Sequence, residues 1–442
     1  MKTKILVRAL ALAGLALPTA AFATNGYFSH AYGLKSLGMG GATVAIADEP
    51  FGGAVNPAAM TSLASTWQAG VQLFMPRREA SRSGSGPAGI DGSVSSDSLL
   101  FAIPEFGINY KMRPDLAIGL SVYGNGGMNT DFAGEQIPAM SACAMFNPAP
   151  GPYNLLCGNG RLGVDLMQLM VAPYAAWQLA PAHSVGVAPV LAYQRFRAQG
   201  LQAFDNAGLS TSPGDVTNRG YASSSGFGVR LGYHGNFDTV SVGVAWASKV
   251  SMGELDKYLG LFAEQGGFDI PSNLTVGMAW RPDAKWTVAV DWERIKYSDS
   301  RSVSNASGLL LNCFGGDASS CMGGSNGPGF GWRDIDVWKF GAQYALNPNL
   351  TLRAGYNRGE NPVSPADATF NILAPGVVED HYTLGATWKL GANSEITAFG
   401  LYAANKTVAG PSLFVPFGAP PSTGETIQLK EYTVGLGYSA RF

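Results

Sequence analysis

Charge and long apolar runs are scarce in this chain of 442 residues. Only 14% of the residues are charged and the formal net charge is −2, so the clustered lysine and arginine on which nucleic-acid binding depends are missing. After the N-terminal region, no uncharged apolar run approaches the roughly 20 residues that a membrane-spanning helix needs. The composition therefore excludes a nucleic-acid partner and a helical membrane protein.

Residues typical of catalytic and metal sites are also few. The four histidines lie far apart in the sequence, and no two carboxylates recur at a spacing that suggests acid and base roles. We therefore expect no enzymatic activity, no cofactor and no metal.

Glycine and aromatic residues, in contrast, are abundant, with 58 glycines and 11% aromatics. The C-terminal residues alternate with period two, and small or polar residues separate apolar ones that share a face: Tyr432, Val434, Leu436, Tyr438, Ala440 and Phe442. This pattern is typical of a strand with lipid on one side and a wet lumen on the other. It predicts a location in a bacterial outer membrane.

The N-terminus has the features of a secretory signal peptide. Lys2 and Arg8 belong to a basic start, an apolar run over residues 9–17 is too short to span a bilayer, and residues 21–23 form an A-x-A cleavage site. We expect residues 1–23 to be removed on export.

Alternating segments from residue 65 onward are separated by short turns and long loops in strict succession. The short turns are rich in Pro, Gly, Asn and Asp and lie at residues 113–115, 180–183, 235–238, 281–283, 346–349 and 390–393. Six turns and seven loops join 14 strands, which predicts an all-β, antiparallel transmembrane β-barrel over residues 65–442. Residues 164–177 and 396–402 alternate poorly, which leaves counts of 12 and 16 open.

Cysteines occur as two near pairs in predicted outer loops, Cys143 with Cys157 and Cys313 with Cys321. In an oxidising compartment this spacing favours two local disulfides, although four cysteines allow three connectivities. Neither spacing resembles a zinc site.

Residues 24–64 are not strand-like. They contain a glycine cluster, Gly38, Gly40 and Gly41, and then Asn56-Pro57-Ala58. The glycines imitate a phosphate loop, but no strand precedes them and no Lys-Ser/Thr follows, so close backbone packing is the better interpretation. Because a 14-stranded barrel leaves an open lumen unless something fills it, we predict that this segment is an N-terminal hatch.

The run over residues 33–42, followed by Asn56-Pro57-Ala58, resembles the N-terminal hatch of FadL-type outer-membrane proteins. The resemblance continues through residues 332–334, 350–356 and 361–363, and so covers essentially the whole mature chain. That family comprises long-chain fatty-acid transporters and their aromatic-hydrocarbon relatives. The resemblance implies a monomeric barrel, plugged by its N-terminus, that transports passively.

The resemblance also implies a route for the substrate. An apolar compound is caught among the outer loops, moves to a pocket inside the barrel, and leaves sideways where the third strand is kinked. In this chain the third strand begins near residue 117, and the kink falls in Gly124, Asn125, Gly126 and Gly127, because glycine weakens a ladder and tolerates unusual backbone angles. The alternative is that these glycines begin the next loop.

Inward-facing cations are the candidates for contact with a ligand head group. Alternation turns Arg230, Lys339 and Arg353 into the lumen, and Arg195 resembles a family position near the head group. Alternatively, these cations pair with carboxylates of the wall or the hatch and hold the plug.

Apolar residues at helical spacing, Leu255, Leu259 and Phe262, predict a short helix with an apolar stripe in an outer loop. The stripe is a candidate for first capture of the ligand, and the alternative is that it packs against its own loops.

The predicted function is passive uptake of hydrophobic molecules across the outer membrane, with long-chain fatty acids as the first candidate. Aromatic or alkane hydrocarbons such as toluene are the second, and a general diffusion porin is the third, although porins lack such a plug. The expected partners are the ligand, outer-membrane lipid and lipopolysaccharide, and the barrel-assembly machinery.

Overall fold

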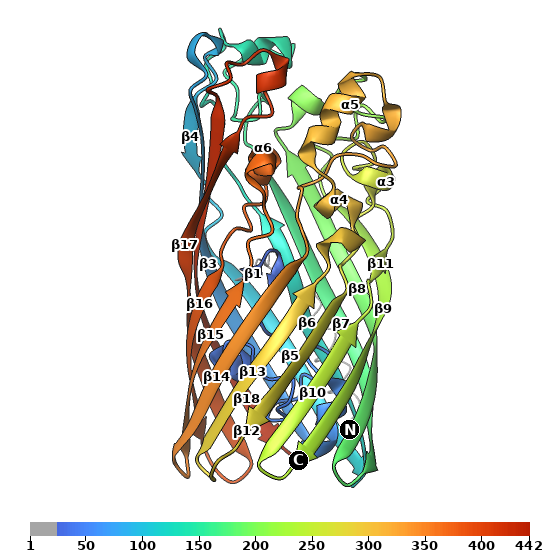
Figure 1. Ribbon diagram of the computed structural model, residues 1–442, viewed down its shortest axis with the longest axis vertical. Helices are drawn as coiled ribbons and strands as arrows, with labels where there is room; N and C mark the ends of the chain where they lie inside the picture. Colours follow the sequence, from blue (N-terminus) through green and yellow to red (C-terminus); the bar gives the residue numbers. More distant parts are fainter. Residues whose placement is uncertain (1–23) are drawn as a thin grey trace, which may run out of the picture.

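The fold is a closed antiparallel β-barrel (Figure 1). The computed structural model describes residues 24–442, so the predicted signal peptide lies outside the described residues. Each wall strand pairs with the preceding one, and the last wall strand pairs with the first over its full length, which closes the barrel. The wall has fourteen strands: β3 (Thr66–Ser83), β5 (Phe101–Arg113), β6 (Leu116–Asn129), β7 (Gly163–Ala180), β8 (His183–Gln199), β9 (Ala222–Phe237), β10 (Val240–Ala247), β12 (Asn273–Trp280), β13 (Trp286–Ile295), β14 (Ile335–Asn347), β15 (Leu350–Gly359), β16 (Asp380–Lys389), β17 (Ser394–Pro411) and β18 (Gly424–Arg441). The predicted count of 14 is confirmed.

Tight turns join the strands at one end of the barrel and long loops join them at the other, uppermost in Figure 1. The loops carry short elements: η2 (Gly86–Ala88), β4 (Gly92–Ser95), η3 (Ala142–Met145), η4 (Gln202–Phe204), β11 (Ser251–Met252), α3 (Ala263–Gly266), η5 (Tyr297–Asp299), α4 (Arg301–Ser304), η6 (Ser307–Leu309), α5 (Leu310–Phe314), η7 (Ala318–Ser320), η8 (Pro365–Asp367), α6 (Ala368–Asn371) and η9 (Val415–Phe417). Among the described residues, no helix has the length and apolar character needed to cross a membrane.

Side chains along the wall alternate between the lipid face and the lumen, as the sequence pattern predicts. On β10, for example, Trp246 is 41% exposed on the outer face whereas Ala245 is fully buried. Three charged side chains of β13 and β14, those of Asp291, Glu293 and Lys339, point inward and are buried. The outer face is therefore apolar and the interior holds the charges.

In one segment where alternation is poor, the side chains that face the lumen are apolar. Residues 396–402 lie within the continuous strand β17, where Phe399 and Leu401 face inward and belong to the same buried cluster as Leu34. At this position the side chains of β17 contact apolar residues such as Leu34 and not water, so polar side chains are not favoured there. Period-two patterning weakens for that reason, although the strand itself is regular.

The helix predicted around Leu255, Leu259 and Phe262 is not present, and this prediction is wrong. These residues lie in a run of turns, and the first helix of the loop, α3, begins after them. The hydroxyl of Tyr258 donates to the carbonyl of Gly220 in a neighbouring loop at 2.7 Å, and this tertiary contact holds the chain in turns. Leu255 and Phe262 are buried, so the stripe packs against the other loops.

Residues 24–64 lie inside the ring of strands, in dark blue in Figure 1, and are almost entirely buried. Their elements are β1 (Thr24–Asn25), β2 (Phe28–Ser29), α2 (Leu34–Gly38) and η1 (Pro57–Ser62). The loop after α2 presses directly on the wall. A Cβ on Gly40, whose φ is 64°, would lie 2.8 Å from the backbone nitrogen of Tyr356, so glycine is required there.

The Asn56-Pro57-Ala58 turn fixes the other end of this segment. The Asn56 amide donates to the carbonyl of Val44 at 2.8 Å and to that of Tyr233 on β9 at 2.9 Å, while its oxygen accepts from the Ala58 backbone N–H at 3.1 Å. One side chain therefore caps η1 and ties the segment to the wall.

Candidate functional site

The third wall strand, β6, carries a bulge at the predicted position. Its register with β7 shifts between Gly124 and Gly126, so Asn125 is an extra residue. The Asn125 amide donates to Gln168 of β7 at 3.0 Å, and its side-chain oxygen accepts from the hydroxyl of Tyr32 at 3.0 Å. The four residues 124–127 lie within β6 and do not begin the next loop.

The wall is incomplete beside this bulge. The ladder between β5 and β6 ends at Phe106 opposite Val122, and in the described structure no pairing joins residues 101–105 to residues 123–129. Instead, Phe28 of β2 pairs with Gly126. We call this break in the ladder the side gap, and the N-terminal segment lies against its inner edge.

Three cavities follow one another from the outer loops to the side gap. The outer cavity is lined by residues including Phe146, Leu209, Leu310, Phe414 and Phe417, and the middle cavity by Phe196, Phe262, Phe330, Phe370 and Leu373. Phe204 borders both. The third, the gap cavity, is lined by residues including Tyr27, Arg78, Gly127, Met128, Trp332 and Ala374.

The middle and gap cavities are lined by neighbouring residues. Leu373 of the middle cavity precedes Ala374 of the gap cavity, and the rings of Phe330 and Trp332, one from each, lie 6.2 Å apart. The Trp332 indole donates to the side-chain oxygen of Asn371 at 2.6 Å, and Thr130, just beyond β6, donates to the Leu373 carbonyl at 2.8 Å. The boundary between the two cavities is thus tied to the strand that borders the side gap.

All three cavities are small. Their volumes are about 20 Å³ for the outer, 40 Å³ for the middle and 30 Å³ for the gap cavity. A cavity of about 150 Å³ is the size known to hold benzene. The structure is therefore in a closed state, and a ligand passes only if aromatic side chains move.

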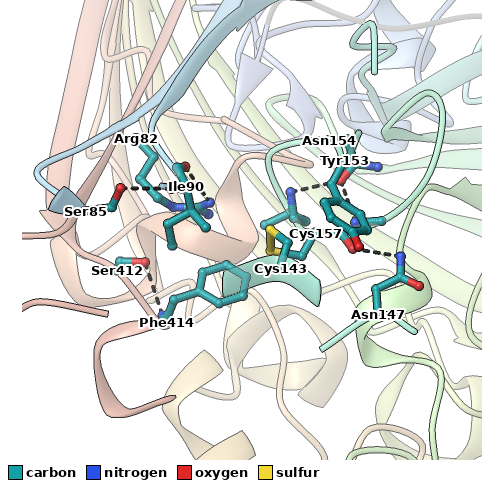
Figure 2. The surroundings of a disulfide bond; sticks show 12 residues. Arg82, Ser85, Ile90, Cys143, Asn147, Tyr153, Asn154, Cys157, Ser412 and Phe414 are labelled. Carbon is teal, nitrogen blue, oxygen red and sulfur yellow. Dashed lines mark hydrogen bonds between the residues drawn. A yellow bond between two sulfur atoms is a disulfide. The ribbon is translucent and has the colours of Figure 1, made fainter. Parts of the chain in front are cut away.

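Disulfides brace the outer loops, and Figure 2 shows one of them, between Cys143 and Cys157, together with Phe414, which lines the outer cavity. Disulfides join Cys143 to Cys157 and Cys313 to Cys321, which is the local pairing that the spacing favours. Behind Phe414, a fully buried ion pair joins Arg82 of β3 to Glu425 of β18 at 2.8 Å. The Arg82 guanidinium lies 4.5 Å from the centre of the Phe414 ring, so this wall of the cavity has a fixed position.

The cations predicted from alternation do not gather in one place. Lys339 pairs with Glu293 at 2.7 Å, and Arg230, which borders the same small polar cavity, donates to the Val55 carbonyl at 3.3 Å. Arg353 lies elsewhere, 3.5 Å from Asp48 of the N-terminal segment. Arg195 is near the outer rim, with its guanidinium 4.3 Å from the centre of the Tyr221 ring.

A carboxylate also anchors α2. The backbone N–H groups of Lys35 and Ser36 donate to Glu49 at 3.0 and 2.7 Å. Burial, with Asp48 beside it, raises the pKa of Glu49 to about 7, which lowers the cost of burying this group near neutral pH.

Sequence reasoning missed the residues that line the cavities. Phe204, Phe330 and Leu373 come from three different loops, and no local pattern brings them together. Arg78 could have been identified from the sequence, because strict alternation along β3 turns its side chain into the lumen.

Comparisons with known proteins agree with this fold. Residues 157–410 match the family described as outer membrane protein transport protein (OMPP1/FadL/TodX). Among solved structures, the chain is similar to the toluene transporter TodX of P. putida, with a TM-score of 0.67, 16% identity and coverage of 93% of this chain and 99% of that one. It is similar to the Ralstonia pickettii toluene transporter TbuX, with a TM-score of 0.62, 16% identity and coverage of 93% and 99%. A Pseudomonas aeruginosa FadL homologue has a TM-score of 0.65 and 13% identity, with coverage of 94% and 100%. No curated protein matches the sequence.

Proposed function

The chain belongs to the outer membrane protein transport family (OMPP1/FadL/TodX), channels of the bacterial outer membrane for hydrophobic substrates, and we propose that its own substrates leave through the side gap beside β6. Support comes from the succession of three apolar cavities that leads from the outer loops to this gap. Each buried methylene group is worth about 0.8 kcal/mol, so an aqueous exit would forfeit a large favourable term. A side exit keeps the substrate in apolar surroundings throughout.

We propose that residues 24–64 form the hatch, residues 65–442 the barrel, and residues 1–23 the signal peptide. The burial of the hatch and its contacts with β6, β9 and β15 support a plug that must shift before a substrate passes. In this proposal Arg353 and Arg230 hold the hatch, because each contacts it, while Lys339 pairs with Glu293 of the wall.

First capture takes place at the outer loops. Phe262 lines the middle cavity and its ring lies 4.7 Å from that of Phe196, whereas Leu259 is half-buried at the surface. Leu255 supports this patch from below, since it is fully buried.

Long-chain fatty acids are the substrate that the geometry supports best. In this closed state each cavity measures only about 20 to 40 Å³, but the cavities follow one another closely. A flexible chain one methylene wide can occupy several of them in turn, while a rigid ring needs all of its space at one point.

Monoaromatic hydrocarbons are the second candidate. The middle cavity is bordered by five phenylalanines, and no charged side chain of the described residues lines it. Such a surface favours uncharged aromatic compounds through ring contacts.

The test is uptake of labelled oleate, with toluene as competitor, in a bacterium that lacks its own channel of this type. Cells expressing the chain should take up oleate faster than cells with an empty vector. Toluene entry without oleate entry would instead establish the second candidate. Deletion of residues 24–64 distinguishes both candidate channels from a general diffusion porin. Ion conductance should rise if the segment is a plug and stay constant if it is not.

The remaining partners follow from the barrel. The sheet closes on itself between β18 and β3, and we propose that the protein works as a monomer. The apolar outer face would contact lipid and the loops lipopolysaccharide, after insertion by the barrel-assembly machinery.

A further inference from the structure

One buried cation differs from the others in its surroundings. Arg78 of β3 is 5% exposed and lines the gap cavity among apolar side chains, including Phe74, Met128 and Trp332. One terminal nitrogen donates to the carbonyl of Ser98. Within residues 24–442, Arg78 makes no salt bridge and its Nε has no hydrogen-bond partner.

Other inward cations of the barrel are neutralised more directly. Arg82, four residues along the same strand, pairs with Glu425 at 2.8 Å, and Lys339 pairs with Glu293 at 2.7 Å. Arg230 borders a polar cavity that contains two carboxylates. A buried charge normally requires a partner of opposite sign, because its loss of hydration is costly. Arg78 makes no such salt bridge within the described residues, and most of the other residues that line its cavity are apolar.

The lining of the gap cavity includes one carboxylate, which affects the electrostatic surroundings of Arg78. Glu431 of β18 also lines it and attracts Arg78 electrostatically. Glu431 has interactions of its own within the protein. Its negative charge opposes a second anion, so a carboxylate ligand would bind here weakly enough to leave, as a channel requires.

We infer that Arg78 binds the carboxylate of a long-chain fatty acid in the gap cavity, immediately before the side gap, and so selects acids over uncharged hydrophobic compounds. This inference rests on the proposed function, since it assumes that substrates pass the side gap. The geometry suits this role, because the buried guanidinium Nε has no hydrogen-bond partner in the described residues and Phe74, Met128 and Trp332 line the same cavity, where an acyl chain would lie.

The experiment compares two ligands of the same chain, oleate and oleyl alcohol, on the full-length barrel purified in detergent. Arg78→Gln should weaken oleate binding roughly 10- to 100-fold, the range of a hydrogen bond to a charged group, and leave oleyl alcohol binding unchanged. Glu431→Gln should tighten oleate binding. Arg77→Gln is the matched control, because Arg77 is adjacent on β3 but faces outward, and it should change neither ligand.

Heat-modifiable migration on gels confirms that each variant has folded. If Arg78→Gln does not fold, Glu431→Gln still decides, because unchanged oleate affinity in that variant overturns the inference. Equal oleate binding by wild type and a folded Arg78→Gln variant also overturns it, while the proposed function stands if wild type takes up oleate in cells. A wild-type protein that binds and transports neither ligand overturns both.

Discussion

Replacing Gly126 by alanine should loosen the hatch from β6. A Cβ at this position would lie 1.7 Å from the carbonyl oxygen of Tyr27, although contacts below 3.0 Å essentially never occur, so the hairpin β1–β2 must retreat by at least 1.3 Å. That retreat breaks the pairing of Phe28 with Gly126 and the bond from the Gly127 N–H to the Tyr27 carbonyl at 3.3 Å.

The cost can be worked from these contacts. Overpacking costs about 1–3 kcal/mol, and one lost hydrogen bond adds about 1 kcal/mol. A total of about 2–4 kcal/mol shifts the ratio of docked to undocked hairpin by a factor of roughly 30 or more.

Hydrogen exchange of the purified barrel measures this shift. The amides of residues 27–29 should exchange at least roughly 30-fold faster in Gly126→Ala than in wild type. Gly400→Ala is the control, because a Cβ there meets nothing within 4 Å on β17. Equal protection in the two variants would refute the claim that the hatch is seated on the bulged strand.

Three further changes test other parts of the structure. Phe204→Ala should join the outer and middle cavities and raise the initial rate of oleate uptake; an unchanged rate would show that this ring is no barrier. Replacing Cys143 and Cys157 by serine should remove up to about 3 kcal/mol of constraint from the loop and make it more sensitive to protease, and equal cleavage would contradict this. Glu425→Gln leaves the Arg82 charge buried without its partner at a cost of about 3–5 kcal/mol, so the temperature of heat modification should fall, and a constant temperature would count against the ion pair.

The barrel could be predicted from the sequence because its signals are local. Period-two alternation, as in residues 240–246, and turn residues such as those at 281–283 each require only neighbours along the chain. The proposed boundaries of the N-terminal segment rest on the loss of that alternation. The glycines of residues 124–127, which tolerate the extra residue, made the bulge one of two interpretations that the sequence left open.

What could not be predicted depends on contacts between distant segments. The turns around Tyr258 result from a hydrogen bond to another loop, which overrides helical spacing. Phe399 faces inward and belongs to the same buried cluster as Leu34 of the N-terminal segment. The cavities join residues of separate loops, such as Phe204 and Phe370, whose rings lie 5.7 Å apart. None of these contacts leaves a pattern in the local sequence.

Exit of a fatty acid through the side gap is the central claim, and photo-crosslinking tests it most directly. A diazirine-bearing fatty acid would be crosslinked to the protein in outer-membrane vesicles, and the adducts located by mass spectrometry. We predict adducts on residues 101–105 of β5 and 123–129 of β6, which border the gap. Adducts that continue along the lumen to the tight turns, with none at the gap, would contradict the claim.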